Sequence, residues 1–190
     1  EFYSASKASA ENIIEAFNNE ILKENKNIVV VRSGNVIGGG DRGKHRLIPD
    51  IVNSIKENKK IILRNPESIR PWQSILDSLS GYLISAEYSY INKKDEKFNL
   101  NSEVNNKYNV LEVTEKLVKV WESNSEIEIN NDKIVKETDH LFINSDKAKK
   151  VLDWSANTNI EESLNKIVIW EKSLNKYEES LKQVKDFFNS

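Results

Sequence analysis

Apolar positions along the chain follow a helical period in some stretches and a strand pattern in others. Between Ser6 and about Asn25 they recur every three or four residues, which predicts a long helix with one buried stripe. Residues 28–31 then form a short β-branched run, typical of a parallel strand that is covered on both faces. A helix followed by such a strand is half of an α/β repeat. The stripe of the helix consists of Ala10, Ile13, Ile14, Phe17 and Ile21.

The alternation of helix and strand patterns continues along the rest of the chain. Pro49 suits the first position of a short helix, and residues 61–63 form a second apolar strand. Asn109 and Asn159 are expected N-caps of later helices. The helix expected after the strand at 61–63 carries an apolar face made of Leu76, Leu79, Leu83, Ala86 and Tyr90. The remaining expected strands cover residues 98–100, 126–129 and 141–143, and the remaining helices cover residues 110–121, 146–154 and 160–188.

Composition is typical of a soluble globular chain. Of the 190 residues 38% are hydrophobic, and no apolar run approaches the roughly 20 residues that a membrane helix needs. Basic and acidic residues nearly balance, 28 against 30, so we expect neither a nucleic-acid partner nor a membrane partner. The absence of cysteine excludes disulfides and thiolate metal sites and suits a cytoplasmic protein. His45 and His140 lie far apart in the sequence, so no metal site is expected.

The chain contains no methionine. Natural reading frames start with one, and here the first residues already belong to a helical pattern. We therefore expect the sequence to be part of a longer protein. Removal of an initiator methionine is the alternative explanation.

Tyr3 and Lys7 form the first candidate chemical site. Their spacing of four residues places a phenol and an ammonium on one face of the predicted helix. An ammonium there stabilises the phenolate and so helps the phenol to move a proton. The alternative is an exposed tyrosine beside a solvated lysine, and the pair alone does not decide between the two.

Two loops are candidates for ligand binding. The stretch 32–41, directly after the strand at 28–31, holds four of the six glycines. Ligands bind at the carboxyl ends of parallel strands in open α/β sheets, although a flexible turn explains clustered glycines equally well. The stretch 64–73 contains two prolines, Arg64 and Arg70. Arginines in a stiffened loop suit a phosphate-bearing ligand, and surface salt bridges are the alternative.

The order of these motifs resembles the extended short-chain dehydrogenase/reductases that act on nucleotide sugars. The residues that carry the resemblance are Tyr3-Ser4-Ala5-Ser6-Lys7, then a buried strand, then Arg32-Ser33-Gly34-Asn35-Val36. Within that group the chain looks like the CDP-glucose 4,6-dehydratase family. This narrower similarity rests on residues 34–41, 46–50, 64–73, 79–83, 145–148 and 152–154.

The resemblance implies an NAD-dependent lyase that converts CDP-D-glucose to CDP-4-dehydro-6-deoxy-D-glucose and water. Tyr3 and Lys7 are then the catalytic residues. They also contact NAD, together with Ser33, Asn35 and Val36. The residues expected to bind the nucleotide sugar are Asn35, Arg46, Leu47, Ile48, Arg70 and Gln73. Related epimerases, dehydratases that use another nucleotide, and a non-catalytic substrate-binding module remain as alternatives.

The resemblance also implies the fold class. We expect an α/β chain that comprises the C-terminal part of a Rossmann-type parallel sheet and a smaller, mostly helical substrate-binding lobe. Residues 1–100 are expected to form the C-terminal half of the dinucleotide-binding fold with inserted substrate loops, and residues 101–190 the lobe. The family's N-terminal NAD-binding βαβ unit has no counterpart in the sequence. We expect the intact enzyme to be a homo-oligomer, and the chain by itself to be inactive.

Overall fold

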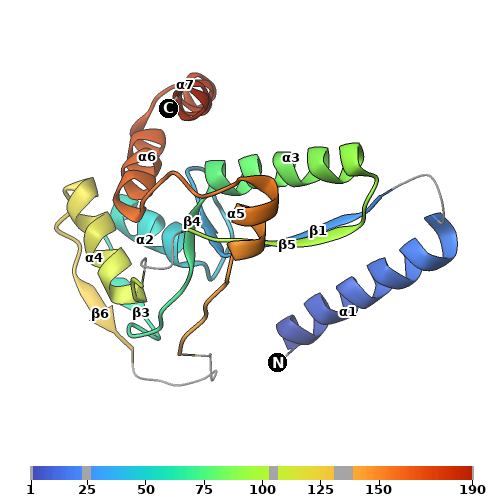
Figure 1. Ribbon diagram of the computed structural model, residues 1–190. Helices are drawn as coiled ribbons and strands as arrows, with labels where there is room; N and C mark the ends of the chain where they lie inside the picture. Colours follow the sequence, from blue (N-terminus) through green and yellow to red (C-terminus); the bar gives the residue numbers. More distant parts are fainter. Residues whose placement is uncertain (1, 23–26, 103–106, 131–138, 190) are drawn as a thin grey trace.

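The computed structural model describes residues 2–22, 27–102, 107–130 and 139–189. Figure 1 shows helices and strands that alternate along most of this length. The helices are α1 (Phe2–Phe17), the π-helical turn η1 (Asn18–Leu22), α2 (Leu47–Lys56), α3 (Ile75–Asn92), α4 (Val110–Trp121), α5 (Asp146–Leu152), α6 (Ile160–Lys172) and α7 (Lys176–Phe188). The strands are β1 (Val29–Ser33), β2 (Asn35–Ile37), β3 (Ile61–Leu63), β4 (Trp72–Ser74), β5 (Glu96–Leu100) and β6 (Ile127–Ile129).

The strands form parallel pairs throughout the described part of the chain. Strand β1 pairs with β5, β2 with β4, and β3 with β6. Parallel strands need crossover connections: α2 lies in the one from β2 to β4, α3 in the one from β1 to β5, and α4 in the one from β3 to β6. The α/β fold class expected from the sequence is therefore confirmed. No helix in the described ranges is long and apolar enough to cross a lipid bilayer.

Two clusters of buried side chains hold the elements together. The larger cluster packs α2, α4 and α6 around β3 and β4, and Ile51, Leu117 and Leu164 are fully buried in it. The smaller cluster surrounds Phe98 and Leu100 of β5. The larger cluster draws residues from both sides of residue 100, and the division into two domains at that position stays a prediction.

Helix α4 forms where the sequence predicts it. Asn109 accepts a hydrogen bond from the backbone N–H of Glu112, and the Glu112 carboxylate accepts one from the backbone N–H of Asn109. This capping box satisfies two backbone donors at the start of the helix. The side chain of Asn159 caps α6 by accepting from the backbone N–H of Glu162.

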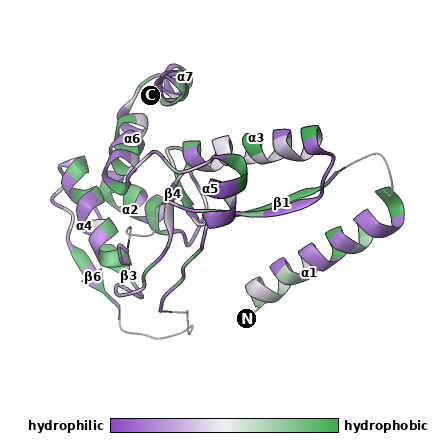
Figure 2. Ribbon diagram, in the orientation of Figure 1, coloured by the Kyte–Doolittle hydropathy of each residue, from purple (hydrophilic) through white to green (hydrophobic). Residues whose placement is uncertain are grey.

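The predicted burial of the first helix is wrong for this structure. Helix α1 forms, but none of its residues is buried, and the side chain of Ile13 is 68% exposed. The helix lies beside the β1–β5 pair (Figure 1), with hydrophobic residues along its length (Figure 2). Polar contacts attach it, including the ion pairs of Glu11 with Arg32 and of Glu15 with Lys97. No element in the described ranges covers its apolar stripe. The ion pairs hold the helix in place without burying it.

The predicted core face of helix α3 is also wrong. Helix α3 buries a row of small or polar residues, and its leucines Leu79 and Leu83 are exposed. Close packing explains why this face rather than the leucine face is buried, since a Cβ at Gly81 would come within 2.4 Å of a methyl carbon of Leu100. Only small side chains let the helix approach β5 this closely. The buried row consists of Asp77, Ser78, Gly81, Ser85 and Ser89.

The shorter predicted elements have mixed outcomes. The strands expected at 61–63, 98–100 and 126–129 are confirmed as β3, β5 and β6. Residues 141–143 form no strand, and a bridge from His140 to Ile69 is the pairing found there. Pro49 is the third residue of α2 rather than the first, a position that also lacks an intrahelical N–H partner. Part of the predicted long helix, residues 23–25, falls outside the described residues.

Candidate functional site

A cleft of about 910 Å³ opens where β1 and β2 end. Its walls come from the β1–β2 junction, the beginning of α2 with the loop before it, and the loop between β3 and β4. The sequence predicted ligand binding at two of these loops. The candidate residues found on the lining are Tyr3, Ser33, Asn35, Val36, Arg46, Leu47, Ile48 and Arg70.

The β1–β2 junction forms one wall through a close backbone contact. The backbone N–H of Asn35 donates to the carbonyl of Pro71 at 2.7 Å, and β2 then pairs with β4. Gly34, the residue between β1 and β2, lies against Pro71. The contact places Asn35 and Val36 beside Trp72 and Gln73, which are 37 residues further along the chain. Segments far apart in sequence thus meet at this wall of the cleft.

Arg46 lies at the cleft with a fixed acidic neighbour. Its Nη1 donates to Oδ2 of Asp41 at 2.9 Å, and Oδ1 of the same carboxylate accepts from the backbone N–H of Gly43 at 2.9 Å. Asp41 therefore closes a short turn and orients the guanidinium next to it. Leu47 and Ile48, the first two residues of α2, continue the wall from this point.

Further charges surround the same space. Arg64, Arg70 and His45 line the cleft together with Asp50. Burial raises the pKa of the Asp50 carboxyl, although the charges of His45 and Arg64 and a backbone hydrogen bond at His45 act in the opposite direction. Arg70 donates through Nη1 to the carbonyl of Ile69 at 3.0 Å, which holds its side chain along the loop. Several guanidinium groups around one cleft suit a ligand that carries phosphate.

Tyr3 reaches the cleft from α1, whereas Lys7 is not part of the lining. Tyr3 is 67% exposed, and Nζ of Lys7 lies 5.5 Å from the centre of its ring. The two side chains therefore share a face of α1, as their spacing predicts. Their catalytic roles stay predictions.

Gln73 lies behind the cleft wall. Its side chain is 1% exposed, and its Oε1 accepts from the backbone N–H of Gly34 at 3.3 Å. Its Nε2 has no hydrogen-bond partner among the described residues. In this arrangement Gln73 supports the junction that carries Asn35, and direct contact with a substrate stays a prediction.

Some lining residues were not singled out as site residues from the sequence. Arg64 belongs to the same proline-containing loop as Arg70, so the loop itself was the available signal. Trp72 follows Pro71, is buried, and donates through its indole N–H to the carbonyl of Tyr108 at 2.9 Å. Leu141 carried no signal, because only the fold brings it to the cleft. Among the described residues no group of three histidine, aspartate or glutamate side chains could hold a metal ion.

Sequence comparison gives two consistent matches. The family model described as GDP-mannose 4,6 dehydratase matches residues 1–167. A curated relative, CDP-glucose 4,6-dehydratase of Salmonella typhimurium, is 34% identical over 200 residues, with 99% of this chain and 56% of the relative covered. The chain thus spans about half the length of that relative. The resemblance inferred from the motifs is confirmed.

Solved structures of the same kind share the fold. The dTDP-glucose 4,6-dehydratase of Bacillus anthracis, in complex with NAD, is 25% identical with a TM-score of 0.75, covering 92% of this chain and 53% of that one. The UDP-glucose-4-epimerase of Stenotrophomonas maltophila, with bound NAD, is 13% identical with a TM-score of 0.76, covering 90% and 54%. The second likeness concerns the fold alone.

Proposed function

The chain belongs to the GDP-mannose 4,6-dehydratase family, and from this premise we propose that it forms the substrate-binding part of a CDP-glucose 4,6-dehydratase. The observation that carries the proposal is the cleft, which brings Tyr3 of α1 together with Arg46 and Arg70 from two separate loops. A proton-transferring phenol and phosphate-binding guanidiniums are the groups that a nucleotide-sugar dehydratase needs on one ligand. Residues 1–100 then complete the dinucleotide-binding fold, and residues 101–190 form most of the substrate lobe.

Different residues of the chain have different roles in the proposed reaction. Arg46 and Arg70 hold the diphosphate, with Leu47 and Ile48 against the nucleoside and Asn35 on the sugar or diphosphate. The Tyr3 phenolate takes the proton from the C4 hydroxyl of the glucose, and the Lys7 ammonium stabilises that phenolate. Water then leaves across C5 and C6 of the sugar. The bound nucleotide thereby places the sugar at Tyr3.

NAD is the cofactor of the proposed reaction, and the residues present fit its nicotinamide end. Tyr3, Ser33, Asn35 and Val36 lie together at the end of β1, the carboxyl edge where ligands of α/β sheets bind. Lys7, one turn along α1 from Tyr3, would hold the nicotinamide ribose. When bound, NAD accepts the hydride from the sugar and later returns it.

Cytidine recognition is the finer part of the proposal. It rests on the motif 38–41, a glycine triplet followed by aspartate, and on the motif 46–49, both of which resemble the CDP-glucose enzymes. In the structure the two motifs are joined by the ion pair of Asp41 with Arg46, and Asp41 and residues 46–49 line the cleft. A ligand that fills the cleft therefore touches Asp41 of the first motif and residues of the second.

The test compares nucleotides and substrates. Calorimetric titration of the chain should give tighter binding for CDP than for dTDP or GDP. The intact gene product, supplied with NAD, should turn over CDP-glucose in preference to dTDP-glucose and GDP-mannose. Comparable turnover of dTDP-glucose would refute cytidine specificity, and conversion of a UDP-sugar to its C4 epimer would assign the protein to the epimerases instead.

A further inference from the structure

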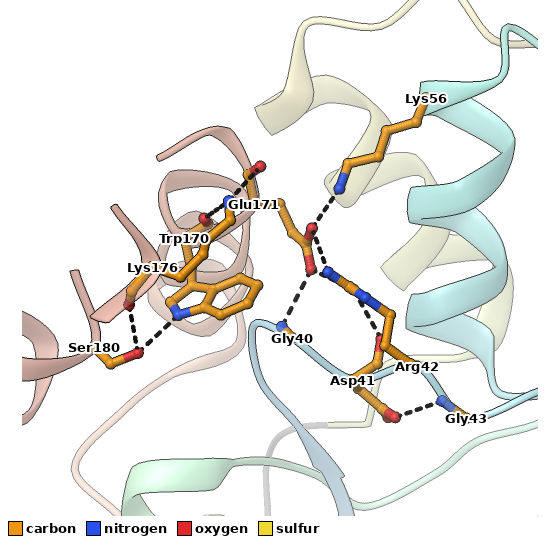
Figure 3. A network of polar contacts seen from close by, with 9 residues as sticks. All are labelled: Gly40, Asp41, Arg42, Gly43, Lys56, Trp170, Glu171, Lys176 and Ser180. Carbon is orange, nitrogen blue, oxygen red and sulfur yellow. Dashed lines mark hydrogen bonds and ion pairs between the residues drawn. The ribbon is translucent and has the colours of Figure 1, made fainter. Parts of the chain in front are cut away.

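The side chain of Glu171 is buried at the end of α6, 2% exposed, although it is charged. Its Oε1 accepts from the backbone N–H of Gly40 at 3.1 Å and from Nη1 of Arg42 at 2.9 Å, and its Oε2 accepts from Nζ of Lys56 at 2.5 Å. Figure 3 shows these donors converging on the one carboxylate. Burial by itself raises the pKa of Glu171, but the hydrogen bonds from Arg42, Lys56 and Gly40 lower it to about 2.

The donors come from the two ends of one chain segment. Gly40 and Arg42 stand where the segment begins, before α2, and Lys56 is the last residue of α2. Between them the segment supplies Asp41, Arg46 and the first turn of α2 to the cleft wall. A single carboxylate thus holds both ends of the wall, from a helix that lies more than 100 residues further along the sequence.

Trp170, the neighbour of Glu171, holds the same loop by packing. A Cβ at Gly39 would come within 2.6 Å of the indole, and one at Gly40 within 2.8 Å, so the glycines lie directly on the ring. Gly40 also has a φ of +82°, which favours glycine. The indole N–H donates to Oγ of Ser180 at 2.9 Å, and Nζ of Lys176 lies 4.7 Å from the ring centre. Helix α7 therefore fixes the indole from its far side (Figure 3).

The contacts continue from the loop to the cleft through Asp41. This residue follows Gly40 directly, and its carboxylate binds both the Gly43 amide and the Arg46 guanidinium. Glu171 itself does not line the cleft. Glu171 can therefore affect the binding of a ligand only by way of the loop.

We propose that Glu171 is a positioning residue that fixes the segment 40–56, and through Asp41 holds the Arg46 guanidinium at the mouth of the nucleotide-sugar cleft. The attachment of the loop stands on the contacts of this structure alone, and its effect on ligand binding rests on the proposed function. A merely exposed ion pair would contribute little, but this carboxylate is almost fully buried and has three donors, so neutralising it removes the charged attachment of the loop and leaves only the packing on Trp170.

The test uses the substitution Glu171→Gln, which keeps the size of the side chain and removes its charge. The matched control is Glu161→Gln on the same helix, where an exposed carboxylate pairs with Lys116. Hydrogen exchange of backbone amides, followed by NMR, reports on the loop directly. We expect the Gly40 and Gly43 amides to exchange at least about tenfold faster in Glu171→Gln, while amides of β3 and β6 keep their rates. The control should leave all of these amides unchanged.

Binding of CDP provides the second measurement. We expect Glu171→Gln to weaken CDP binding by about tenfold, with Glu161→Gln unaffected. Unchanged exchange at Gly40 and Gly43 would overturn the attachment, and accelerated exchange with unchanged CDP affinity would overturn the positioning of Arg46. If the unsubstituted chain does not bind CDP, the proposed function fails, while the exchange comparison still decides the attachment.

A second variant covers the case in which Glu171→Gln does not fold. Lys56→Gln removes one donor at a side chain that is 41% exposed, so folding should survive. It should accelerate exchange at Gly40 less than the loss of the carboxylate does, but more than Glu161→Gln. Exchange rates equal to the control would count against the proposal.

Discussion

Gly34 and Pro71 are in direct backbone contact: an ideal Cβ on Gly34 would stand 2.1 Å from the Pro71 carbonyl oxygen. The same oxygen accepts the N–H of Asn35 at 2.7 Å. The glycine is therefore required by space at the point where the chain leaves β1 and enters β2. Since Asn35 and Val36 follow at once, this contact sets one wall of the cleft.

The first prediction concerns this contact. Gly34→Ala should lower the free energy of unfolding by about 1–3 kcal/mol or more, because the added methyl group forces Pro71 and β4 away. Gly43→Ala is the control, since its Cβ would meet a side-chain atom, Cδ of Arg46, rather than the backbone of a neighbouring strand. Urea unfolding of both variants measures the difference. Equal loss in the two variants would contradict the proposed crowding.

The second prediction tests Tyr3 as the proton acceptor. In the intact gene product, Tyr3→Phe should reduce turnover of CDP-glucose by about 10² to 10⁴, because the ring stays but the hydroxyl is lost. Binding of CDP and NAD should change little. Tyr90→Phe is the control, as Tyr90 is exposed on α3 and lies outside the cleft lining. Near-normal turnover of Tyr3→Phe would assign Tyr3 a structural role.

The third prediction concerns the guanidinium of Arg70. Arg70→Lys should weaken CDP binding by about tenfold, because an ammonium cannot make two parallel hydrogen bonds to a phosphate. Arg32→Lys, which changes an arginine outside the cleft lining, should bind CDP normally. Calorimetric titration of both variants gives the comparison. If both bind CDP as the unsubstituted chain does, Arg70 does not contact the diphosphate.

The fourth prediction follows from the low pKa of Glu171. Its pKa is lowered from the ordinary value of 4.5 to about 2, so the folded state favours the charged form. This contribution to stability is fully present above about pH 4.5 and is lost as the pH falls toward 2, with a size of about 1–3 kcal/mol. Asp50 and Asp77, whose pKa values burial raises, act with the opposite sign.

The difference between variant and unsubstituted chain is therefore the quantity to measure. Urea unfolding between pH 3 and pH 7 should show the Glu171→Gln chain less stable than the unsubstituted chain at neutral pH. The difference in the free energy of unfolding should shrink as the pH falls below about 4.5. A gap that stays constant over this range would contradict the assigned pKa.

The sequence predicted elements well where one local signal was sufficient. Helix α4 begins after Asn109 because the cap and the apolar stripe are both local, and β3 is a short apolar run at the predicted place. Burial was predicted less well. The apolar stripe of α1 shows which face would be buried, but not whether another element covers it, and on α3 Gly81 rather than Leu83 meets the sheet.

The candidate site was predictable to a similar extent. Loop chemistry marked Arg70, because prolines near arginines are visible in the sequence, and Arg46 was marked by the family resemblance. The supports of these loops were not predictable. Glu171 bonds to Gly40 across 131 residues, and no periodic pattern connects two such positions. Distances of this kind follow only from the packing of α6 on the loop.

The last prediction concerns the 190-residue chain by itself, which should bind NAD weakly and should also self-associate. Gly38, Gly40 and Gly43 have the spacing of a dinucleotide-binding turn, but that turn holds a pyrophosphate with free N–H groups at a helix N-terminus. Here the Gly40 N–H is bound to Glu171, and α2 begins only at Leu47. Calorimetric titration should therefore give an affinity weaker than micromolar, and a micromolar affinity in a monodisperse monomer would reveal a cofactor site within this chain.

The same chain should self-associate through its uncovered apolar surface. Within the described residues β1 pairs with β5 alone, and Ile13 of α1 and Leu83 of α3 are 68% and 65% exposed. Such a strand edge and such side chains favour association in water. Ile13→Glu and Leu83→Glu should reduce association in sedimentation experiments without lowering the free energy of unfolding, because neither side chain is buried. A loss of stability in these variants would mean that α1 and α3 are covered within a single chain, and the association would then need another surface.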